Sequence, residues 1–471
     1  MSPPGESGRE QAAMAARWLR WLLSLGLLLG SCLNAAAAQP TAIGAVTPTA
    51  TAPRWTEADI RASRVEAAGA AAWPHRPRWN ADPMNLFVVV EAGDAHLSLV
   101  DGDRFEVVHR LRSRPALQGP PRFSPDGRFA YFGSRDGWIT RYDLWNLALV
   151  AEVRAGLELG SLAISQDGRW LMAANPSPPT LVLFDAGLNL VKTWVAGNRD
   201  GTTGSRIAAV IDAAPRQSFI VALQDIPELW EISYDPKVED FYDGLVHDYR
   251  MAEGLPTRGF LNPRRTTIAE PLESLFFDPE TTQVAGVAQA KDGSAVLQLV
   301  NLDVRRRVAS LPLAGAPRLG GAAAFRRNDA MLLAVPNRER ATVDVIDLRT
   351  WSAVKSVATA GPTSFVRSHA GTRFAWSNAM TDRDGHGALA LIDRQTLETV
   401  TGVADGAEGV VDIALSRDGR HAWVSRNGPA AALIVYDAAT LKQVKRLSMR
   451  QPAAAYNVGN QIARPSAESG R

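Results

Sequence analysis

This chain of 471 residues contains a single cysteine and almost no excess of either charge. One cysteine excludes an internal disulfide, a metal or iron–sulfur site built from cysteines, and the C-x-x-C-H attachment of a c-type heme. The 51 Lys and Arg residues nearly balance 49 Asp and Glu residues, so the charge favours neither a nucleic acid nor a cationic partner. The seven histidines show no local metal spacing. With 46% hydrophobic and 21% charged residues, the composition is that of a globular protein.

The first 38 residues have the parts of a secretory signal. Arg17 and Arg20 precede an apolar run, residues 21–29, which is shorter than the roughly 20 residues of a membrane span. The tetrapeptide that ends at Cys32 resembles a bacterial lipobox and predicts a lipid on that cysteine. The alternatives are ordinary cleavage near Ala38, which releases a soluble protein, and an uncleaved anchor. Each of them places the body of the protein outside the cytoplasm.

A repeat of short strands follows residues 39–83, an Ala-, Pro- and Thr-rich stretch that predicts a linker. Eight alternating or apolar runs end in Asp, at intervals of 42 to 50 residues except for one of 68. A period of about 40–50 residues is typical of propeller blades, each a four-stranded antiparallel sheet. We therefore predict an all-β, eight-bladed β-propeller over residues 84–460 and a disordered tail over 461–471. The aspartates are expected to cap turns, and they are Asp101, Asp143, Asp185, Asp235, Asp303, Asp347, Asp393 and Asp437.

The long interval points to an insertion, residues 236–271, with about 20 residues more than a blade requires. It contains His247 and Tyr249 among several arginines, including Arg258. Long insertions in compact folds are often functional, and Arg pairs with carboxylates and stacks on aromatic faces. The insertion is therefore a candidate site for an anionic planar ligand such as a carboxylated macrocycle. The alternative is a solvated arginine-rich loop.

Several motifs resemble the heme d1 propeller of the cytochrome cd1 family over residues 84–460. The similarity is greatest to the branch of dihydro-heme d1 dehydrogenase (NirN), and the NirF lipoproteins of heme d1 biosynthesis are more distant. The resemblance implies a cytochrome d1-like propeller that holds heme d1 or its precursor without a covalent bond. The N-terminal cytochrome c domain of NirN is missing. The matching segments are residues 134–137, 142–145, 242–255, 260–266, 271–278, 300–308 and 456–458.

The resemblance also implies which residues bind the cofactor. Arg135 and Arg206 match family arginines that contact the heme propionates, and Arg318 stands where the family has a distal-side His. An alternative for Arg135 is a structural pairing with a neighbouring Asp. Gly119 stands in the place of the proximal heme ligand. The family histidines are therefore missing, which puts redox catalysis in doubt.

Three further residues are candidates for chemistry at the site. His247 is the one histidine in the matching insertion and is a candidate iron ligand or proton-transfer group; the alternative is a surface histidine. Asp412 and Glu408 are candidate acid–base groups at the mouth of the central channel, with no partner evident in the sequence.

These observations support three hypotheses. The first is a periplasmic propeller, soluble or lipid-anchored, that binds a d1-like tetrapyrrole in heme d1 maturation or delivery for nitrite reduction in denitrification. Its implied partners are cytochrome cd1 nitrite reductase and other heme d1 maturation proteins, and the family also implies a homodimer. The second is an oxidoreductase of the dihydro-heme d1 dehydrogenase or nitrite reductase type with a non-standard iron ligand. The third is a degenerate, heme-free propeller that serves as an interaction platform.

Overall fold

The computed structural model describes residues 54–242, 256–380, 387–400 and 409–463. Most regular elements in these ranges are short antiparallel strands. Within the same ranges, no helix combines the length and the apolar character needed to cross a membrane. The helical elements are α2 (Glu57–Ser63), η1 (Ala70–Ala72), η2 (Pro83–Asn85), η3 (Ala214–Arg216), η4 (Leu319–Gly321) and α3 (Val458–Ile462).

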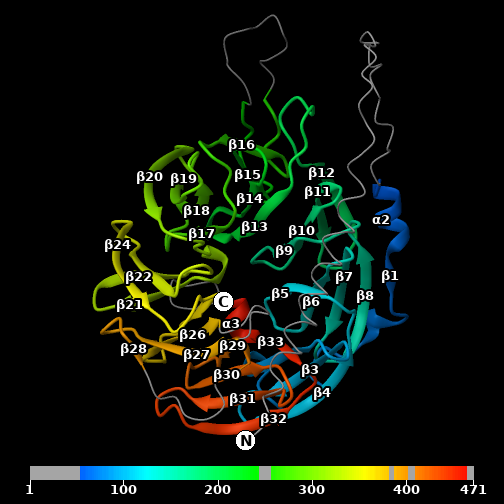
Figure 1. Ribbon diagram of the computed structural model, residues 1–471. Helices are drawn as coiled ribbons and strands as arrows, with labels where there is room; N and C mark the ends of the chain where they lie inside the picture. The colour runs from blue at the N-terminus through cyan, green and yellow to red at the C-terminus, as the bar shows by residue number, and fades with distance from the viewer. Residues whose placement is uncertain (1–53, 243–255, 381–386, 401–408, 464–471) are drawn as a thin grey trace, which may run out of the picture. The chain divides into compact units, whose positions relative to one another are not determined.

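Consecutive four-stranded meanders follow one another and surround a common axis, with α3 near that axis (Figure 1). In the first three meanders the strands pair in chain order, and the short β1 adds a fifth strand at the edge formed by β8. These strands are β1 (Val65–Glu66), β5 (Leu117–Phe123), β6 (Phe129–Ser134), β7 (Trp138–Asp143), β8 (Ala148–Arg154), β9 (Ser161–Ile164), β10 (Trp170–Pro176), β11 (Pro179–Asp185), β12 (Leu190–Val195), β13 (Ile207–Ala213), β14 (Ser218–Leu223), β15 (Glu228–Ser233) and β16 (Pro263–Thr267).

The next meanders continue the pattern, and the last two of them share one eight-stranded sheet through a single pair, Gly387 with Val410. Because the sheet runs across this boundary, which includes the undescribed residues 401–408, the count of eight blades stays a prediction. The strands are β17 (Leu275–Phe277), β18 (Gln283–Gln289), β19 (Ala295–Asn301), β20 (Arg306–Leu313), β21 (Ala323–Arg327), β22 (Ala330–Pro336), β23 (Thr342–Asp347), β24 (Ser352–Ala358), β25 (Val366–Arg367), β26 (Phe374–Met380), β27 (Gly387–Asp393), β28 (Thr399–Val400), β29 (Val410–Leu415), β30 (His421–Arg426), β31 (Ala432–Asp437) and β32 (Gln443–Ser448).

The remaining sheet joins the two ends of the described chain. Its order is β33-β2-β3-β4, so the last strand pairs with the first one of the repeat. This pairing closes the ring and removes two free sheet edges, which would otherwise be open to intermolecular pairing. The strands are β2 (Leu86–Glu91), β3 (His96–Asp101), β4 (Glu106–Arg112) and β33 (Pro452–Asn457).

Strand position within each sheet follows the apolar pattern of the sequence. The first strands of neighbouring sheets contact one another, as β5 does with β9 and β29 with β33, so they are the innermost strands. The fourth strands are outermost, and β24 exposes all but one of its seven residues. Large side chains fill the space between sheets; for example, the rings of Phe87 and Trp423 stack with centroids 4.1 Å apart. Burying each such ring contributes about 2–3 kcal/mol.

The turns confirm the structural interpretation of the repeated Asp and Gly residues. Seven of the eight repeat aspartates accept a backbone N–H two or three residues further on. Asp303 is the exception, because Asn301 caps that turn instead. The Asp-Gly turns place glycine at positive φ, for example Gly127 at 71° and Gly419 at 71°, where a side chain would be strained.

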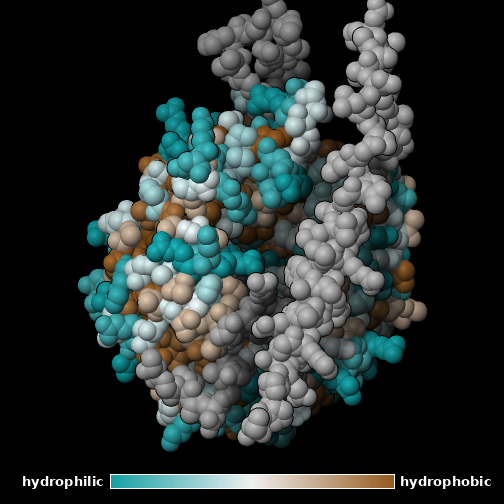
Figure 2. Space-filling view, viewed as in Figure 1, coloured by the Kyte–Doolittle hydropathy of each residue, from teal (hydrophilic) through white to brown (hydrophobic). Residues whose placement is uncertain are grey.

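The two ends of the sheets carry different connections. At one end the innermost strands begin, and we call it the Arg318 end. At the other end the innermost strands finish and α3 lies against β5, β2 and β33; we call it the α3 end. Figure 2 shows hydrophilic residues interspersed with apolar ones over the visible face.

The stretch expected to be a linker, residues 39–83, differs from that expectation over its described part. Residues 57–63 form α2, whose Thr56 cap and Asp59 make a capping box. Ile60 is 2% exposed, and Trp55 donates from its indole Nε1 to the carbonyl oxygen of Arg154 on β8 at 3.1 Å. Ile60 and the preceding Trp55 give this segment an apolar contact with the core between neighbouring sheets, so it packs on the propeller.

The insertion also differs from a simple loop. Its residues 263–267 are β16, the outermost strand of its sheet, and Phe241 and Thr257 form an isolated bridge. The insertion leaves β15 and enters β16 at the α3 end. The described residues of the predicted tail likewise begin inside α3, which extends to Ile462.

Candidate functional site

The three arginines predicted to hold carboxylates lie at the same end of the propeller. Arg135 is in the turn between β6 and β7, Arg206 immediately precedes β13, and Arg318 caps η4 ahead of β21. Topology places them at the same end, because these three connections all emerge at the Arg318 end. Within the described residues, the exposed guanidinium of Arg135 makes no hydrogen bond or ion pair, so the alternative of a structural pairing with a neighbouring Asp is not formed there.

Arg206 is held by a carboxylate of the protein. Its Nη2 and Nε donate to the two oxygens of Asp225 at 2.6 and 3.1 Å. This two-point pairing raises the pKa of Arg206 and lowers the pKa of Asp225. Because the pair is exposed, water screens it and it contributes little stability. A ligand carboxylate at Arg206 would have to compete with Asp225.

Arg318 lies among other cations. Its side chain reaches solvent, yet surrounding protein removes part of its hydration, and Arg338 and Arg367 lie close enough to add positive charge. Together these effects lower the pKa of the Arg318 guanidinium, burial being the largest cause. Positive charges that repel one another near the axis are stabilised by an anion, and guanidinium groups bind carboxylates with paired hydrogen bonds.

Arg367 lies near Arg318 and also contacts the buried carboxyl of Asp412. Its Nη2 donates to Oδ1 of Asp412 at 3.1 Å, which joins β25 to β29 across two meanders. Asp412 is 8% exposed. Burial raises the pKa of Asp412 even though Arg367 and the backbone N–H groups of Ile413 and Ala455 lower it. The carboxyl predicted as an acid–base candidate therefore has a partner and a perturbed pKa.

Tyr456 completes the group from β33. Its side chain is partly buried, and burial together with the nearby Asp412 carboxyl raises the pKa of Tyr456. Arg122 on β5 and Arg367 act in the opposite direction. We name these five residues, all on innermost strands or just ahead of one, the axial cluster: Arg122, Arg318, Arg367, Asp412 and Tyr456.

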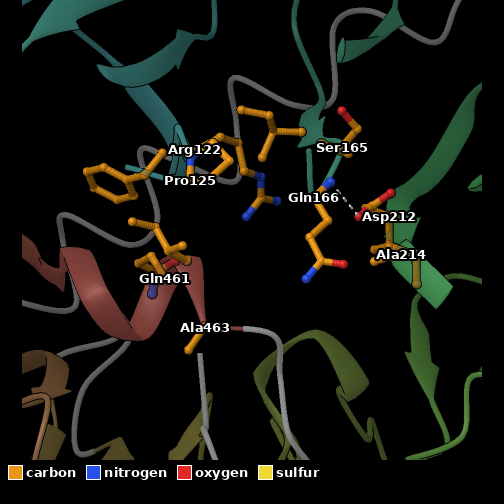
Figure 3. A pocket seen from close by; sticks show the side chains of 13 residues that line it. Arg122, Pro125, Ser165, Gln166, Asp212, Ala214, Gln461 and Ala463 are labelled. Atoms are coloured by element: carbon orange, nitrogen blue, oxygen red, sulfur yellow. Dashed lines mark hydrogen bonds between the residues drawn. The ribbon is translucent and has the colours of Figure 1, made fainter. Parts of the chain in front are cut away.

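A cavity lies beside the axial cluster at the α3 end (Figure 3). It has an empty volume of about 670 Å³, part of which is open to solvent, between β5, β9, β13 and α3. Arg122 points into it and donates from Nε to the carbonyl oxygen of Leu162 at 2.7 Å. On the other side, the backbone N–H of Gln166 donates to Oδ2 of Asp212 at 3.1 Å. Both a cation and a carboxylate therefore border this cavity.

The structure does not place every predicted site residue. Cys32, His247 and Glu408 lie outside the described residues. The described flanks of the insertion are at the α3 end, whereas Arg135, Arg206 and Arg318 are at the opposite end. The described flanks of the insertion and the three arginines therefore lie at opposite ends of the sheets.

Of the described histidines, none lies on an innermost strand. His96 and His109 are on β3 and β4, His421 on β30, and His75 on the N-terminal arm, while His369 is in the turn after β25. In the part of the chain that the structure describes, no three His, Cys, Asp or Glu side chains form a metal site.

Gly119 faces open space on β5. It has φ of 70°, and a Cβ added there would meet no atom within 4 Å. The strand bulges here, because pairing with β6 is irregular between Gln118 and Arg122. The position that the family resemblance assigns to an iron ligand is thus free of side-chain atoms and has room beside it.

Sequence reasoning missed Arg122, Arg367 and Tyr456 as site residues. A signal existed: Arg367 stands immediately ahead of the serine that begins a hairpin turn, where other repeats have the apolar Ile164 and Leu415. Arg122 stands one position earlier in its own repeat, where other repeats have Ala163 and Ala414. A charge at a position that the repeat keeps apolar indicates a function at the axis.

Comparison with known proteins agrees with this architecture. A dihydro-heme d1 dehydrogenase from Pseudomonas aeruginosa is 44% identical over 412 residues, covering 87% of this chain and 78% of that protein. Protein NirF from the same organism is 29% identical over 384 residues, covering 78% of this chain and 90% of NirF. The solved structure of dihydro-heme d1 dehydrogenase NirN in complex with DHE superposes with a TM-score of 0.79 at 43% identity, covering 88% and 83% of the two chains.

These similarities confirm the predicted resemblance and the all-β cytochrome d1-like propeller. The model of the cytochrome D1 heme domain matches residues 81–461, which include the whole predicted propeller. By this match and by its similarity to the dehydrogenase over most of both proteins, the chain belongs to the cytochrome D1 heme domain family.

Proposed function

We propose that this protein binds a d1-type heme or its precursor at the axis, near the Arg318 end, and acts in the maturation or delivery of heme d1. The observation that carries the proposal is the group of guanidinium groups at Arg318, Arg338 and Arg367, for which the described residues provide a single carboxylate, that of Asp412. A solved relative of 43% identity is described in complex with DHE, which supports a ligand of this class.

The residues present fit the carboxylates of such a group. Arg318 and Arg135 would hold them, because neither guanidinium is paired with a carboxylate among the described residues. Arg206 would contribute less, because Asp225 already occupies its donors. Open space beside Gly119 leaves room for a flat ring system next to β5. A d1-type heme would supply an iron and a conjugated macrocycle that can exchange electrons.

The chain's own residues bind and orient this ligand. Arg318 stabilises a carboxylate by charge-assisted hydrogen bonds, which are worth about 1.5–3 kcal/mol each. α3 and the residues around it border the opposite end, so the arginines orient the acidic edge of the macrocycle toward the Arg318 end. Tyr456 stays protonated because its pKa is raised, and it can donate a hydrogen bond toward the axis.

Compartment, lipidation and partners follow as further parts of the proposal. The secretory leader supports a periplasmic protein, and Cys32 would carry the lipid if the lipobox is used. A protein that delivers heme d1 would meet a cytochrome cd1 nitrite reductase or another maturation protein. His247 would ligate the iron only if its segment reaches the axis, so its role is tested separately below.

Absorbance titration of the purified protein with heme d1, with heme b as the comparison ligand, tests the proposal. We expect a saturable shift of the red bands with heme d1. Arg318→Ala should weaken binding about tenfold or more, since it removes a charge-assisted contact. Arg306→Ala, an exposed arginine on the outermost strand β20, is the matched control and should bind as the unchanged protein does.

Two outcomes decide between the alternatives. If the wild-type protein shows no saturable change, the heme hypotheses are wrong and a heme-free interaction platform remains. If heme d1 binds and His247→Ala changes the iron spectrum, that histidine is the ligand. In that case the second hypothesis, an oxidoreductase with a non-standard ligand, becomes testable by reducing the bound iron.

A further inference from the structure

We infer that Asp412 takes up a proton when a carboxylated ligand binds at the axial cluster, because the ligand takes Arg367 away from it. This inference rests on the proposed function and states how binding at the same site is regulated by pH. The sequence suggested Asp412 as an acid–base group but gave it no partner. The structure shows that Arg367 is this partner.

Arg367 is shared between two positions. Its Nη2 contacts Asp412, and its charge also acts on Arg318. The Arg367 side chain is 17% exposed, so it is only partly enclosed. A carboxylate that arrives at Arg318 therefore comes within the field of Arg367 and competes with Asp412 for its hydrogen bonds.

Among the described residues, the cation that contacts Asp412 is Arg367. The strands packed against β29 are β25, β26, β27, β30 and β33. From β33, Tyr456 faces Asp412 and carries no charge while protonated, and the N–H of Ala455 donates to the carboxyl. The charged or titratable groups of the neighbouring strands are Arg367 on β25, Tyr456 on β33, Asp393 at the far end of β27, and His421 and Arg426 at the ends of β30; β26 has none.

Loss of Arg367 makes the charged form of Asp412 costly. A buried carboxylate without a cation is destabilised strongly, and such groups bind a proton instead of remaining charged. Burial already raises the pKa of Asp412 while Arg367 is in contact. An anionic ligand nearby adds a further repulsion in the same direction. The proton comes from solvent to the carboxylate oxygen, and the Arg367 N–H groups then donate to the ligand.

The sign of the pH dependence follows. The pKa of Asp412 is higher in the complex than in the free protein, so between these two values binding takes up one proton. Affinity then falls about tenfold for each unit of pH increase across that window. Below the pKa of the free protein, Asp412 is protonated in both states and the dependence disappears.

Isothermal titration with heme d1 tests this in two buffers of different ionisation enthalpy, at pH values from about 5.5 to 8.5. The difference in apparent enthalpy gives the number of protons taken up per ligand. We expect up to one proton for the wild-type protein and none for Asp412→Asn, whose affinity should be independent of pH. Asp278→Asn is the matched control, because Asp278 is also 8% exposed but caps a turn at the α3 end; it should keep the uptake.

The outcomes are distinguishable. Failure of heme d1 to bind the wild-type protein overturns the proposed function. Binding without proton uptake anywhere in this range, or uptake that persists in Asp412→Asn, overturns only the inference and leaves the Arg367–Asp412 pair as a structural link between β25 and β29. If Asp412→Asn does not fold, as judged by circular dichroism, the wild-type measurement with Asp278→Asn still decides whether uptake occurs.

Discussion

At the scale of single residues, the burial of a charged side chain and its ion-pair partner decide whether it is available to bind a ligand. The sequence predicts three ligand-binding arginines, Arg135, Arg206 and Arg318, and the surroundings of their side chains differ. Arg206 has a two-point carboxylate partner, whereas Arg318 has other arginines near it. Sequence reasoning identified these three arginines as candidates by their residue type and by the family resemblance. It could not identify which guanidinium is already paired, because Arg206 and Asp225 meet only after β13 and β14 have formed.

The turn that carries Arg135 gives a prediction about stability. Gly137 has φ of 89°, and a Cβ there would come within 2.0 Å of the carbonyl oxygen of Gly156. Gly293 lies in the equivalent turn of another sheet at φ of 82°, with no atom within 4 Å of that position. Gly293→Ala should therefore cost about 1–2 kcal/mol of strain. Gly137→Ala should cost at least about 2 kcal/mol more, because the neighbouring backbone must move.

Urea unfolding followed by tryptophan fluorescence measures both variants under one set of conditions. Equal losses in the free energy of unfolding for the two variants would show that the backbone around Gly156 can move at little energetic cost. In that case the orientation of Arg135 would not depend on this close approach.

At the scale of elements, the repeated turns were predicted well because their chemistry is local. An Asp that accepts N–H groups two and three residues ahead needs no distant contact, so the sequence pattern contains all of it. The Arg367–Asp412 contact is different, since it joins strands of two meanders separated by 45 positions. Only the closed arrangement of the sheets brings those two side chains together.

The capped turns predict an acid sensitivity that can be assigned to one residue. Asp437 accepts the backbone N–H of Thr440 at 2.7 Å and its hydroxyl at 2.8 Å. These hydrogen bonds lower the pKa of Asp437. A carboxyl whose pKa is lowered by folding stabilises the protein above its ordinary pKa of about 4, and this contribution is lost as pH falls through the folded value.

Asp437→Asn keeps the acceptor but does not titrate. We expect it to be slightly less stable than the wild-type protein at pH 7, by at most about 1 kcal/mol, with the difference shrinking between about pH 5 and pH 3. Urea unfolding at several pH values measures this. Asp329→Asn, at an exposed position, is the control and should show a constant difference. A difference for Asp437→Asn that grows toward acid pH would contradict the assignment.

At the scale of the whole molecule, one strand holds the ring together. β33 pairs with β2 and covers Phe87, Val88 and Val89, each of which is 0% exposed. A chain that ends at Gln451 lacks this strand and exposes side chains worth about 1.5–3 kcal/mol each. Since domains are stable by only about 5–15 kcal/mol, we expect this truncation to be unfolded or aggregated.

A chain that ends at Ala463 retains β33 and α3 and should fold like the full-length protein. Size-exclusion chromatography and circular dichroism compare the two truncations directly. A soluble, folded product ending at Gln451 would mean that β2 tolerates an open edge and that ring closure is dispensable.

Closure by β33 also imposes an order in time on ligand binding. This strand brings Tyr456 to the axis, and it is made after all the other strands that the structure describes. A chain that has not yet been synthesised past β33 therefore lacks one wall of its binding site, however well its earlier sheets have folded. Tetrapyrrole should be acquired only after β33 has been made and has paired with β2, so its binding reports that the ring has closed.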